Sequence, residues 1–301
     1  QAAAYGGMAG RPAHTGDAEL RGSPTPPATV AAVRALWDAG HNEREITSKL
    51  GLTVGQVRGI AIRNHFHYHA GRSTVLDATH PAAVDGHSRF KPKRTGRTHR
   101  ILKSGANQRK LGKVVQKGKW RGMPIFSLTL EERATCPRSC RMWLSCFGNG
   151  MQWANREEHG PKLEARLLKG LRGLQASFPK GFVVRLHLLG DFYSTSYVEF
   201  WYRALVLFPA LHVFGYTAWP TKTRIGAMLH TMRIDCWERF AVRTSGGLHN
   251  EPRTAVKRQA DRRLGEIICP AQTGRTAACS TCGLCWQSKR PIIFKPHGDQ
   301  A

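Results

Sequence analysis

Apolar residues repeat at helical spacing near the start of this chain. The positions are Val30, Val33, Leu36 and Trp37, then Ile46 and Leu50, then Val54, Val57 and Ile60. A repeat of three and four residues places such side chains on one face of a helix. Gly40 and Gly51 separate the three groups, and glycine commonly ends a helix. Residues 28–69 are therefore predicted to form three short helices.

From residue 123 onward, short apolar runs alternate with amphipathic stretches. The predicted strands are 124–130, 182–189, 212–217 and 240–244, and the predicted helices are 153–174, 197–208 and 224–232. This alternation predicts a parallel sheet with right-handed crossovers. About four to six strands fit, which is too few for a complete eight-stranded barrel. The expected fold class is α/β, with a partial parallel barrel or an open sheet.

Capping signals support the second and third of the short helices. Asn42 is the predicted N-cap of the second helix, and Glu45 stands three residues after Asn42, which is the spacing of a capping box. Thr53 occupies the N-cap position of the third helix, just after the turn at Gly51. Two helices joined by a short glycine-containing turn predict a helix-turn-helix.

The third helix of a helix-turn-helix presents its polar side chains to a nucleic-acid groove. Here these side chains are Gln56, Arg58 and Arg63. The run ALWDAGHNEREITSKLGLTVGQVRGIAIRNH resembles the helix-turn-helix of GcrA-like and sigma-factor-like regulators over about forty residues. The alternative is a three-helix packing module that binds nothing.

The charge of the chain points to a polyanionic partner. Lys and Arg number 46 against 20 Asp and Glu, a net charge of +26. Such an excess repels itself unless a polyanion neutralises it, and nucleic acid, with DNA preferred, is the expected partner. No basic amphipathic helix with a bulky apolar face and no membrane-spanning apolar run is evident, so a membrane partner is not expected. A cytoplasmic location is expected, since no secretory signal is evident.

Much of this charge lies in residues 70–122, which are predicted to be a basic linker. From Arg89 to Arg121 there are thirteen Lys or Arg residues and no acid. The residues of this segment expected to contact nucleic acid are Lys91, Lys93, Arg94, Arg97, Arg100, Lys103, Arg109, Lys110, Lys113, Lys117 and Lys119, with Trp120 stacking on bases. The alternative is a solvated charged loop. The predicted organisation is a disordered tail (1–27), the helix-turn-helix (28–69), this linker, an α/β domain (123–260) and a cysteine-rich region (261–301).

Cysteines form two groups with the spacing of metal sites. Cys136, Cys140 and Cys146 follow the first predicted strand. Three thiolates on such a loop hold three corners of a [4Fe–4S] cluster and leave the fourth iron open. The alternative is a structural metal knuckle without an open site. Cys236 stands alone and is interpreted as a buried structural cysteine or a spare ligand.

The second group is Cys279, Cys282 and Cys285, preceded by Cys269 and Pro270. Three cysteines, each separated from the next by two residues, together with a remote Cys-Pro, are the typical ligand set of a ferredoxin-type [4Fe–4S] cluster. Four thiolates without histidine also suit structural zinc, which is the alternative. One or two clusters are therefore expected.

The first cysteine loop resembles that of the radical S-adenosylmethionine superfamily, in which such a loop follows the first strand of a partial barrel. The superfamily usually separates its cysteines by three and then two residues, whereas here the gaps are three and five. The runs LTLEERATCPRSCRMWLSCFGNGMQWANR, VVRLHLLGDFYS, FGYTAW and ICPAQTGRTAACSTCGLCW resemble an uncharacterised radical-SAM-like family of phage and alphaproteobacterial genomes. The resemblance implies a radical enzyme that binds S-adenosylmethionine and acts on or at nucleic acid. The alternative is a non-catalytic DNA-binding regulator with structural or redox-sensing clusters.

Polar residues at the ends of the predicted strands are candidates for the chemistry, because α/β barrels gather their active groups there. Arg185 and His187 are expected to share one face of their strand. The candidate catalytic residues are Asp191, Arg185, His187 and Arg243, and the candidate cofactor-binding residues are Gly190, Asp191, Tyr216, Thr217 and Ser245. They are expected to converge above the first cysteine loop. The resemblance implies that Gly190 and Asp191 receive the methionine amino group; alternatively, Asp191 caps a turn and Arg185 pairs with it.

Overall fold

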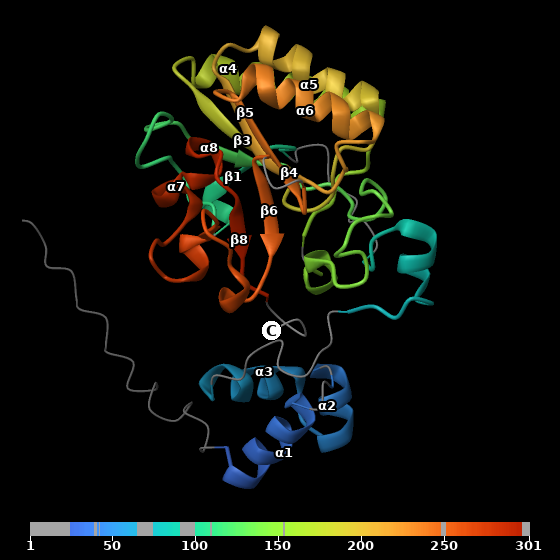
Figure 1. Cartoon of the computed structure of the whole chain (residues 1–301). Coiled ribbons are helices and arrows are strands. Elements are labelled where there is room, and N and C mark those ends of the chain that lie inside the picture. The colour runs from blue at the N-terminus through green and yellow to red at the C-terminus, as the bar shows by residue number, and fades with distance from the viewer. Residues whose placement is uncertain are drawn as a thin grey trace, which may run out of the picture. The chain divides into compact units, whose positions relative to one another are not determined.

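The computed structural model describes residues 25–38, 41, 43–64, 75–90, 100–108, 110–152, 154–247 and 251–296. The chain divides into two compact units, Gln1–Ser73 and Thr74–Ala301, which are described separately (Figure 1). Up to residue 24, the predicted tail lies outside the described residues, and so do Lys91, Lys93, Arg94, Arg97 and Arg109. Within the described parts, no helix combines the length and the apolar character needed to cross a membrane.

The first unit contains the three predicted helices, α1 (Pro27–Asp38), α2 (Glu43–Leu50) and α3 (Val54–Arg63). Their shared core is Val33, Trp37, Ile46, Val57, Ile60 and Ala61. The predicted cap at Thr53 is confirmed, because its hydroxyl accepts the Gln56 N–H and the Gln56 side chain accepts the Thr53 N–H. Gly51 makes the turn before α3 with a φ of +65°, a conformation that suits glycine.

The second unit is built on one sheet of eight strands. The strands are β1 (Lys103–Ser104), β2 (Ile125–Ser127), β3 (Phe182–Leu186), β4 (Leu211–Thr217), β5 (Phe240–Ser245), β6 (Arg253–Val256), β7 (Ile267–Ile268) and β8 (Ile292–Phe294). Their order is β1-β2-β3-β4-β5-β6-β8-β7. Apart from the antiparallel β1–β2 pair, all neighbouring strands run parallel. The sheet is open, with β1 and β7 at its two edges.

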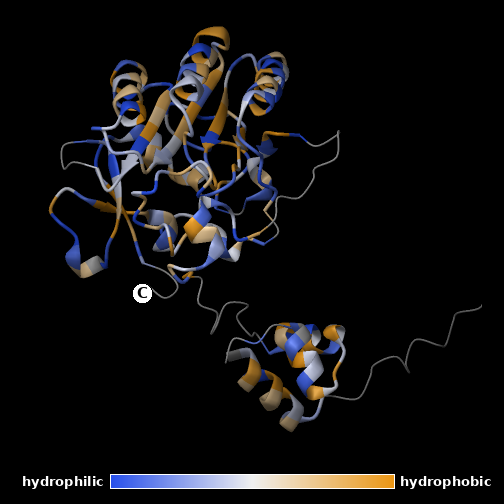
Figure 2. Cartoon of the chain, turned by 90° about the vertical axis from the view of Figure 1, so that its right-hand side faces the viewer, coloured by the Kyte–Doolittle hydropathy of each residue, from blue (hydrophilic) through white to orange (hydrophobic). Residues whose placement is uncertain are grey.

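Three long helices cover one face of the sheet. They are α4 (Pro161–Ser177), α5 (Thr195–Leu207) and α6 (Arg224–Cys236), which lie together in Figure 1. Inward residues of the strands, such as Val184, Val213 and Val242, pack against Leu167 and Trp201 of these helices. Figure 2 shows the hydrophobic residues of the strands directly against the helices.

The opposite face of the sheet is covered by two segments from distant parts of the sequence. Trp120, from the segment before β2, stacks on Trp286, with ring centroids 5.2 Å apart. Trp286 lies on the short helix α8 (Leu284–Gln287), which follows α7 (Cys279–Cys282). Both tryptophans pack on Val183, Phe214 and Ala241 of the strands. Residues 261–296 are therefore part of the core of this unit.

A buried carboxylate ties this C-terminal segment to β6. Glu266 contacts the guanidinium of Arg253 at 2.8 Å and the ammonium of Lys257 at 2.9 Å. Its carboxylate also accepts the backbone N–H of Arg263 at 2.9 Å. The parallel pairing of β8 with both β6 and β7 completes the attachment.

The structure corrects several sequence-based boundaries. The described residues contain eight strands rather than about four to six, because β1, β6, β7 and β8 are short and lack a long apolar run. The helix predicted from residue 153 begins at Pro161, which takes the first helical position, where proline is favoured. The end of the predicted linker, from residue 100 to 122, supplies β1 and Trp120 to the second unit, so no compact unit begins at residue 123.

Candidate metal centres

The first cysteine loop follows β2 at the C-terminal edge of the parallel strands. It packs on the turn after β3, where Gly190 has a φ of +84°. A Cβ atom at Gly190 would lie 2.6 Å from the Leu130 Cβ and from the Thr135 hydroxyl oxygen. The Thr135 hydroxyl also accepts the backbone N–H of Asp191 at 3.1 Å. The predicted proximity of Gly190 and Asp191 to this cysteine loop is therefore present.

A fully buried ion pair supports the far end of this loop. The Arg156 guanidinium donates to both carboxylate oxygens of Glu132, at 2.6 and 3.1 Å, and the side chains are 1% and 0% exposed. Arg156 also donates to the Gly148 carbonyl at 3.0 Å, and the Gly148 N–H points to the Cys146 sulfur at 3.4 Å. The ion pair thus fixes the backbone beside the third cysteine.

A second buried arginine holds the middle of the loop. Arg133 donates to the Trp143 carbonyl at 3.0 Å and to the side-chain oxygen of Asn149. The Asn149 amide in turn donates to the Leu144 carbonyl at 2.7 Å. The loop is therefore closed by side chains that sequence reasoning had not selected.

The three thiols of the loop lie within electrostatic reach of one another. Burial raises the pKa of Cys136 well above its usual value, and the Asp191 carboxylate, Cys140 and Cys146 raise it further. Burial likewise raises the pKa of Cys146 to about 11, while the positive charge of Arg133 opposes the shift. The thiols are therefore neutral near pH 7 unless a cation compensates their charge.

Asp191 is buried and links two strand ends. One carboxylate oxygen accepts the Phe192 N–H at 2.8 Å, and the other accepts the Ala218 N–H, just after β4, at 2.6 Å. Burial raises the pKa of Asp191 to about 7, although these backbone bonds and the Thr217 hydroxyl lower it. This carboxyl group is thus able to hold or release a proton near neutral pH.

The expectation that Arg185 and His187 share one face is wrong. The His187 Nε2 atom lies 3.1 Å from the Tyr197 hydroxyl, on the face covered by α5. Arg185 instead lies over the rings of Phe214 and Tyr216, on the opposite face, 4.3 Å from the Tyr216 ring centroid. Strand β3 ends at Leu186, so the alternation of a strand does not extend to His187. Burial lowers the pKa of His187 to about 3, so its imidazole is neutral.

Three of the predicted pocket residues converge on the second cysteine group and not on the first. Arg185, Tyr216 and Arg243 lie on neighbouring strands and face the side of the sheet that carries α7 and α8. The Tyr216 hydroxyl is 2.9 Å from the Cys285 sulfur. Arg243 is fully buried and donates to the carbonyls of Cys285 at 2.9 Å and Arg290 at 2.8 Å, and to that of Ser288. This arginine holds the backbone that carries the last cysteine.

The four thiols of the second group also influence one another. Burial raises the pKa of Cys279 to about 12; Cys285 adds to this shift, Arg185 opposes it, and Cys269 and Cys282 add further. Burial raises the pKa of Cys285 as well, against the opposing charge of Arg243 and the Tyr216 hydroxyl. Partly buried thiols with nearby cations have the donor chemistry that iron–sulfur and zinc sites use.

The described residues contain no group of three or more His, Cys, Asp or Glu side chains arranged around a single metal ion.

Cys236 lies away from the first cysteine loop. It ends α6, which runs from the C-terminal edge of β4 back to the start of β5. Its thiol lies within electrostatic range of the Arg239 guanidinium, which donates to the carbonyl of Leu211, the first residue of β4. Cys236 thus lies near the N-terminal ends of the parallel strands, whereas the first cysteine loop lies at their C-terminal ends. It is therefore not placed to supply a fourth ligand to the first group.

The remaining predicted residues are distributed over several places. Thr217 is buried beside Asp191, whereas Ser245 is exposed, with its hydroxyl 3.4 Å from that of Thr254. Trp120 is 2% exposed and its indole donates to the Glu238 carbonyl at 3.1 Å. The prediction that Trp120 stacks on bases is therefore wrong, because this side chain belongs to the core.

The predicted nucleic-acid residues of the first unit already have local partners. Gln56 forms the capping box with Thr53. The Arg58 guanidinium pairs with the Glu43 carboxylate at 2.7 Å, although Arg58 is 54% exposed. Arg63 is exposed at the end of α3. In the second unit, Lys110, Lys113, Lys117 and Lys119 are exposed, and Lys119 pairs with Glu238.

No protein-family model, curated protein or solved structure matches this chain.

Proposed function

We propose that the chain is a nucleic-acid-binding iron–sulfur protein whose second unit is a radical-SAM-like partial barrel. The observation that carries this proposal is the separation of seven cysteines into two partly buried groups on one mostly parallel sheet. The first group, Cys136, Cys140 and Cys146, follows the first parallel strand. The second, Cys269, Cys279, Cys282 and Cys285, lies on the face without long helices.

The two groups are assigned different roles. The first has three thiols, and Cys236 lies at the other edge of the sheet. A cluster bound there would keep one iron open, and when bound it supplies one-electron reduction of a ligand at that iron. Asp191, which holds a proton near pH 7, would offer its remaining lone pairs to a donor group of this ligand. The second group has four thiols and is assigned to electron relay or to stabilising the fold.

Anaerobic reconstitution with iron and sulfide tests the assignment. We expect about eight iron atoms per chain, four for each cubane, and absorbance near ~400 nm. Cys140→Ala and Cys282→Ala are each expected to remove about half of the iron, because each removes a ligand of one group. Cys236→Ala is the matched control and should leave the iron content unchanged. Protein that binds zinc but no iron would contradict the proposal.

A non-catalytic regulator is the second candidate, and the contacts of Asp191 favour it. Both carboxylate oxygens accept backbone N–H groups, which is a structural role. S-adenosylmethionine added to the reduced protein separates the two candidates. An enzyme with an open iron is expected to show a changed EPR spectrum, whereas an unchanged spectrum with both clusters present favours the regulator.

Nucleic-acid binding is supported by charge. The net charge is +26, and the exposed cations include Lys110, Lys113 and Lys117. If roughly six to ten phosphates are contacted, affinity for duplex DNA should fall ~10³-fold or more between about 50 and 200 mM salt. A flat salt response would contradict this part of the proposal.

A further inference from the structure

A pocket lined by both polar and apolar side chains lies at the β1 edge of the sheet. Its volume is about 440 Å³, within the range of small-molecule sites. Arg100, Lys103 and Ser104 line it from β1 and the residue stretch before it, and Asn107 lies just beyond. Phe126 of β2 contributes an aromatic side chain. The pocket thus combines two cations, polar side chains and an aromatic ring.

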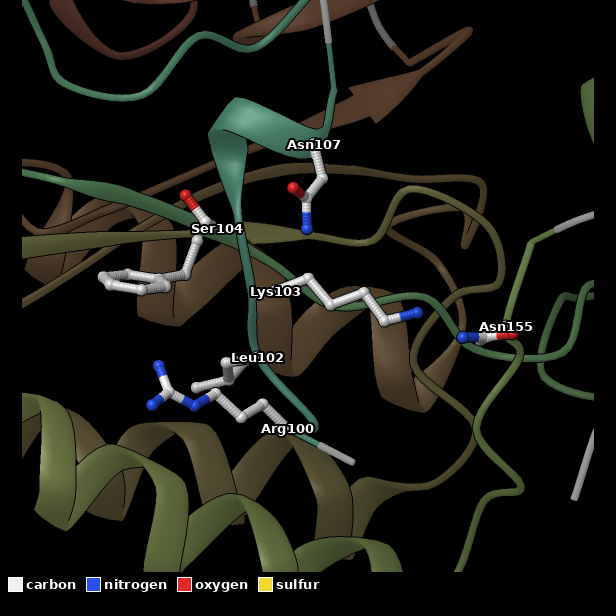
Figure 3. Close-up of a pocket in the computed structure, with 7 residues that line it drawn as sticks. Arg100, Leu102, Lys103, Ser104, Asn107 and Asn155 are labelled. Carbon is white, nitrogen blue, oxygen red and sulfur yellow. The ribbon is translucent and has the colours of Figure 1, made fainter. Parts of the chain in front are cut away.

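The polar side chains of this pocket are available to a ligand. Lys103 extends toward Asn155, and the Asn107 amide points toward Lys103 (Figure 3). Among the described residues, the side chains of Arg100, Lys103, Asn107 and Asn155 make no hydrogen bond or ion pair with one another or with the rest of the protein. Their hydrogen-bonding capacity is therefore unused within the part of the chain that the structure describes.

Lys103 is the most informative of these residues because it is half-buried. Burial lowers the pKa of its ammonium group, and the Glu157 carboxylate opposes that shift. Glu157 is itself paired with Arg166 at 2.6 Å. An ammonium group that has lost part of its hydration gains from an anionic ligand, and phosphate supplies charge-assisted hydrogen bonds.

We propose that this pocket takes one nucleotide of a single-stranded nucleic acid. Lys103 pairs with its phosphate, and its base lies against Phe126. The amides of Asn107 and Asn155 reach the base edge, where asparagine offers both a donor and an acceptor. The base must be unstacked to enter, which a single strand allows. This inference rests on the nucleic-acid binding proposed above and assigns a site to it.

Exposed charge in the same part of the sequence favours a strand over a free nucleotide. Lys110, Lys113 and Lys117, which follow β1 in sequence, are exposed. A single nucleotide would leave these charges without a partner, whereas the phosphates of a strand would meet them.

Fluorescence anisotropy of the full chain with labelled deca-deoxyadenylate and deca-thymidylate tests the pocket. Lys103→Gln is expected to weaken binding of both strands ~10-fold or more, because it removes a charge-assisted contact from a partly buried site. Lys117→Gln removes the same charge from an exposed position outside the pocket and should weaken binding about threefold or less. Asn155→Ala should change the ratio of the two affinities by ~5-fold or more. A duplex of the same sequence should not respond to Asn155→Ala.

Each other outcome has a distinct meaning. Equal losses in Lys103→Gln and Lys117→Gln with an unchanged affinity ratio would overturn the pocket alone. No binding of either strand or the duplex by the wild type would overturn the proposed function as well. If deoxyadenosine monophosphate bound as tightly as the decamer, the proposal that the ligand is a strand would be overturned. Asn107→Ala, at an exposed position, replaces Lys103→Gln if that variant does not give the wild-type circular dichroism spectrum.

Discussion

Replacing Arg156 with methionine is expected to destabilise the second unit by about 3–5 kcal/mol, because it leaves the Glu132 carboxylate buried without its partner. Both side chains are essentially inaccessible, at 1% and 0% exposure. Methionine has a similar length and fills much of the same space, so the loss reports mainly on charge and hydrogen bonding. The effect should appear as a lower midpoint of guanidinium-induced unfolding with an unchanged slope.

The magnitude follows from the contacts that are lost. Arg156 donates twice to Glu132 and once each to the carbonyls of Met151, Ala154 and Gly148, at 3.0–3.1 Å for the carbonyls. Only the Ser88 hydroxyl, at 2.8 Å, would continue to donate to the Glu132 side chain among the described side chains. An unpaired buried charge alone costs several kcal/mol, and each unsatisfied carbonyl adds to that cost.

A double-mutant cycle and an exposed control make the reasoning testable. Glu132→Gln alone should also destabilise strongly, and the double variant should lose at least about 1 kcal/mol less than the sum of the single losses. Lys119→Met breaks a surface pair with Glu238, whose side chains are 37% and 73% exposed, and should cost about 0–1 kcal/mol. An Arg156→Met variant within about 1 kcal/mol of the wild type, or strictly additive losses, would refute the reasoning.

Three further outcomes are expected. Gly190→Ala should lower the free energy of unfolding by about 2 kcal/mol or more, because the new Cβ would clash with the first cysteine loop and the residue has a positive φ. The control is Gly173→Ala in α4, where the Cβ has free space, and it should stabilise the protein slightly. Thermal melts compare the two variants. Burial raises the pKa of Glu266, but hydrogen bonds and basic neighbours lower it to a net value below 4.5, so its stabilisation is complete above that pH and is lost in acid. The deficit of Glu266→Gln in denaturant unfolding at about pH 7 should therefore shrink as the pH falls below 4.5, and a constant deficit would contradict this sign. A chain ending at residue 260 should be insoluble or lack a cooperative melt, because it lacks Trp286, which closes the second core; a soluble, cooperatively melting product would contradict this reading.

The strand-and-helix alternation was predictable because it depends on local apolar periodicity. The three central strands and their helices carry long runs of buried residues, and the structure places them within a few residues of the prediction, apart from the start of α4 at Pro161. Short strands such as β1 and β7 have two residues each, which is too few to show a period. Their existence depends on the neighbouring strand to which they pair, and sequence patterns do not contain that information.

Three of the predicted site residues, Arg185, Tyr216 and Arg243, were assigned to the wrong cysteine group. Strand alternation correctly implies that Arg185, Tyr216 and Arg243 point away from the helices. It does not say which segment covers that face, and only the fold brings the C-terminal cysteines there. Glu132 and Arg156 escaped notice because a charged pair 24 residues apart looks like any other pair of surface charges.

The second cysteine group packs against the core of the second unit, so a metal bound there would also affect folding. Cys279 and Cys285 pack against the cluster formed by Trp120, Trp286 and the inner face of the strands. Burial raises the pKa of Cys269, Cys279 and Cys285, and a metal cluster bound there would convert these thiols into charged ligands beside Arg185 and Arg243. Because the same segment closes the core, the energy of metal binding there would be added directly to the stability of the sheet. The first group lies on a loop that Arg133 and Arg156 hold closed through their own hydrogen bonds, so protein side chains contribute to the shape of this loop in addition to any metal bound there.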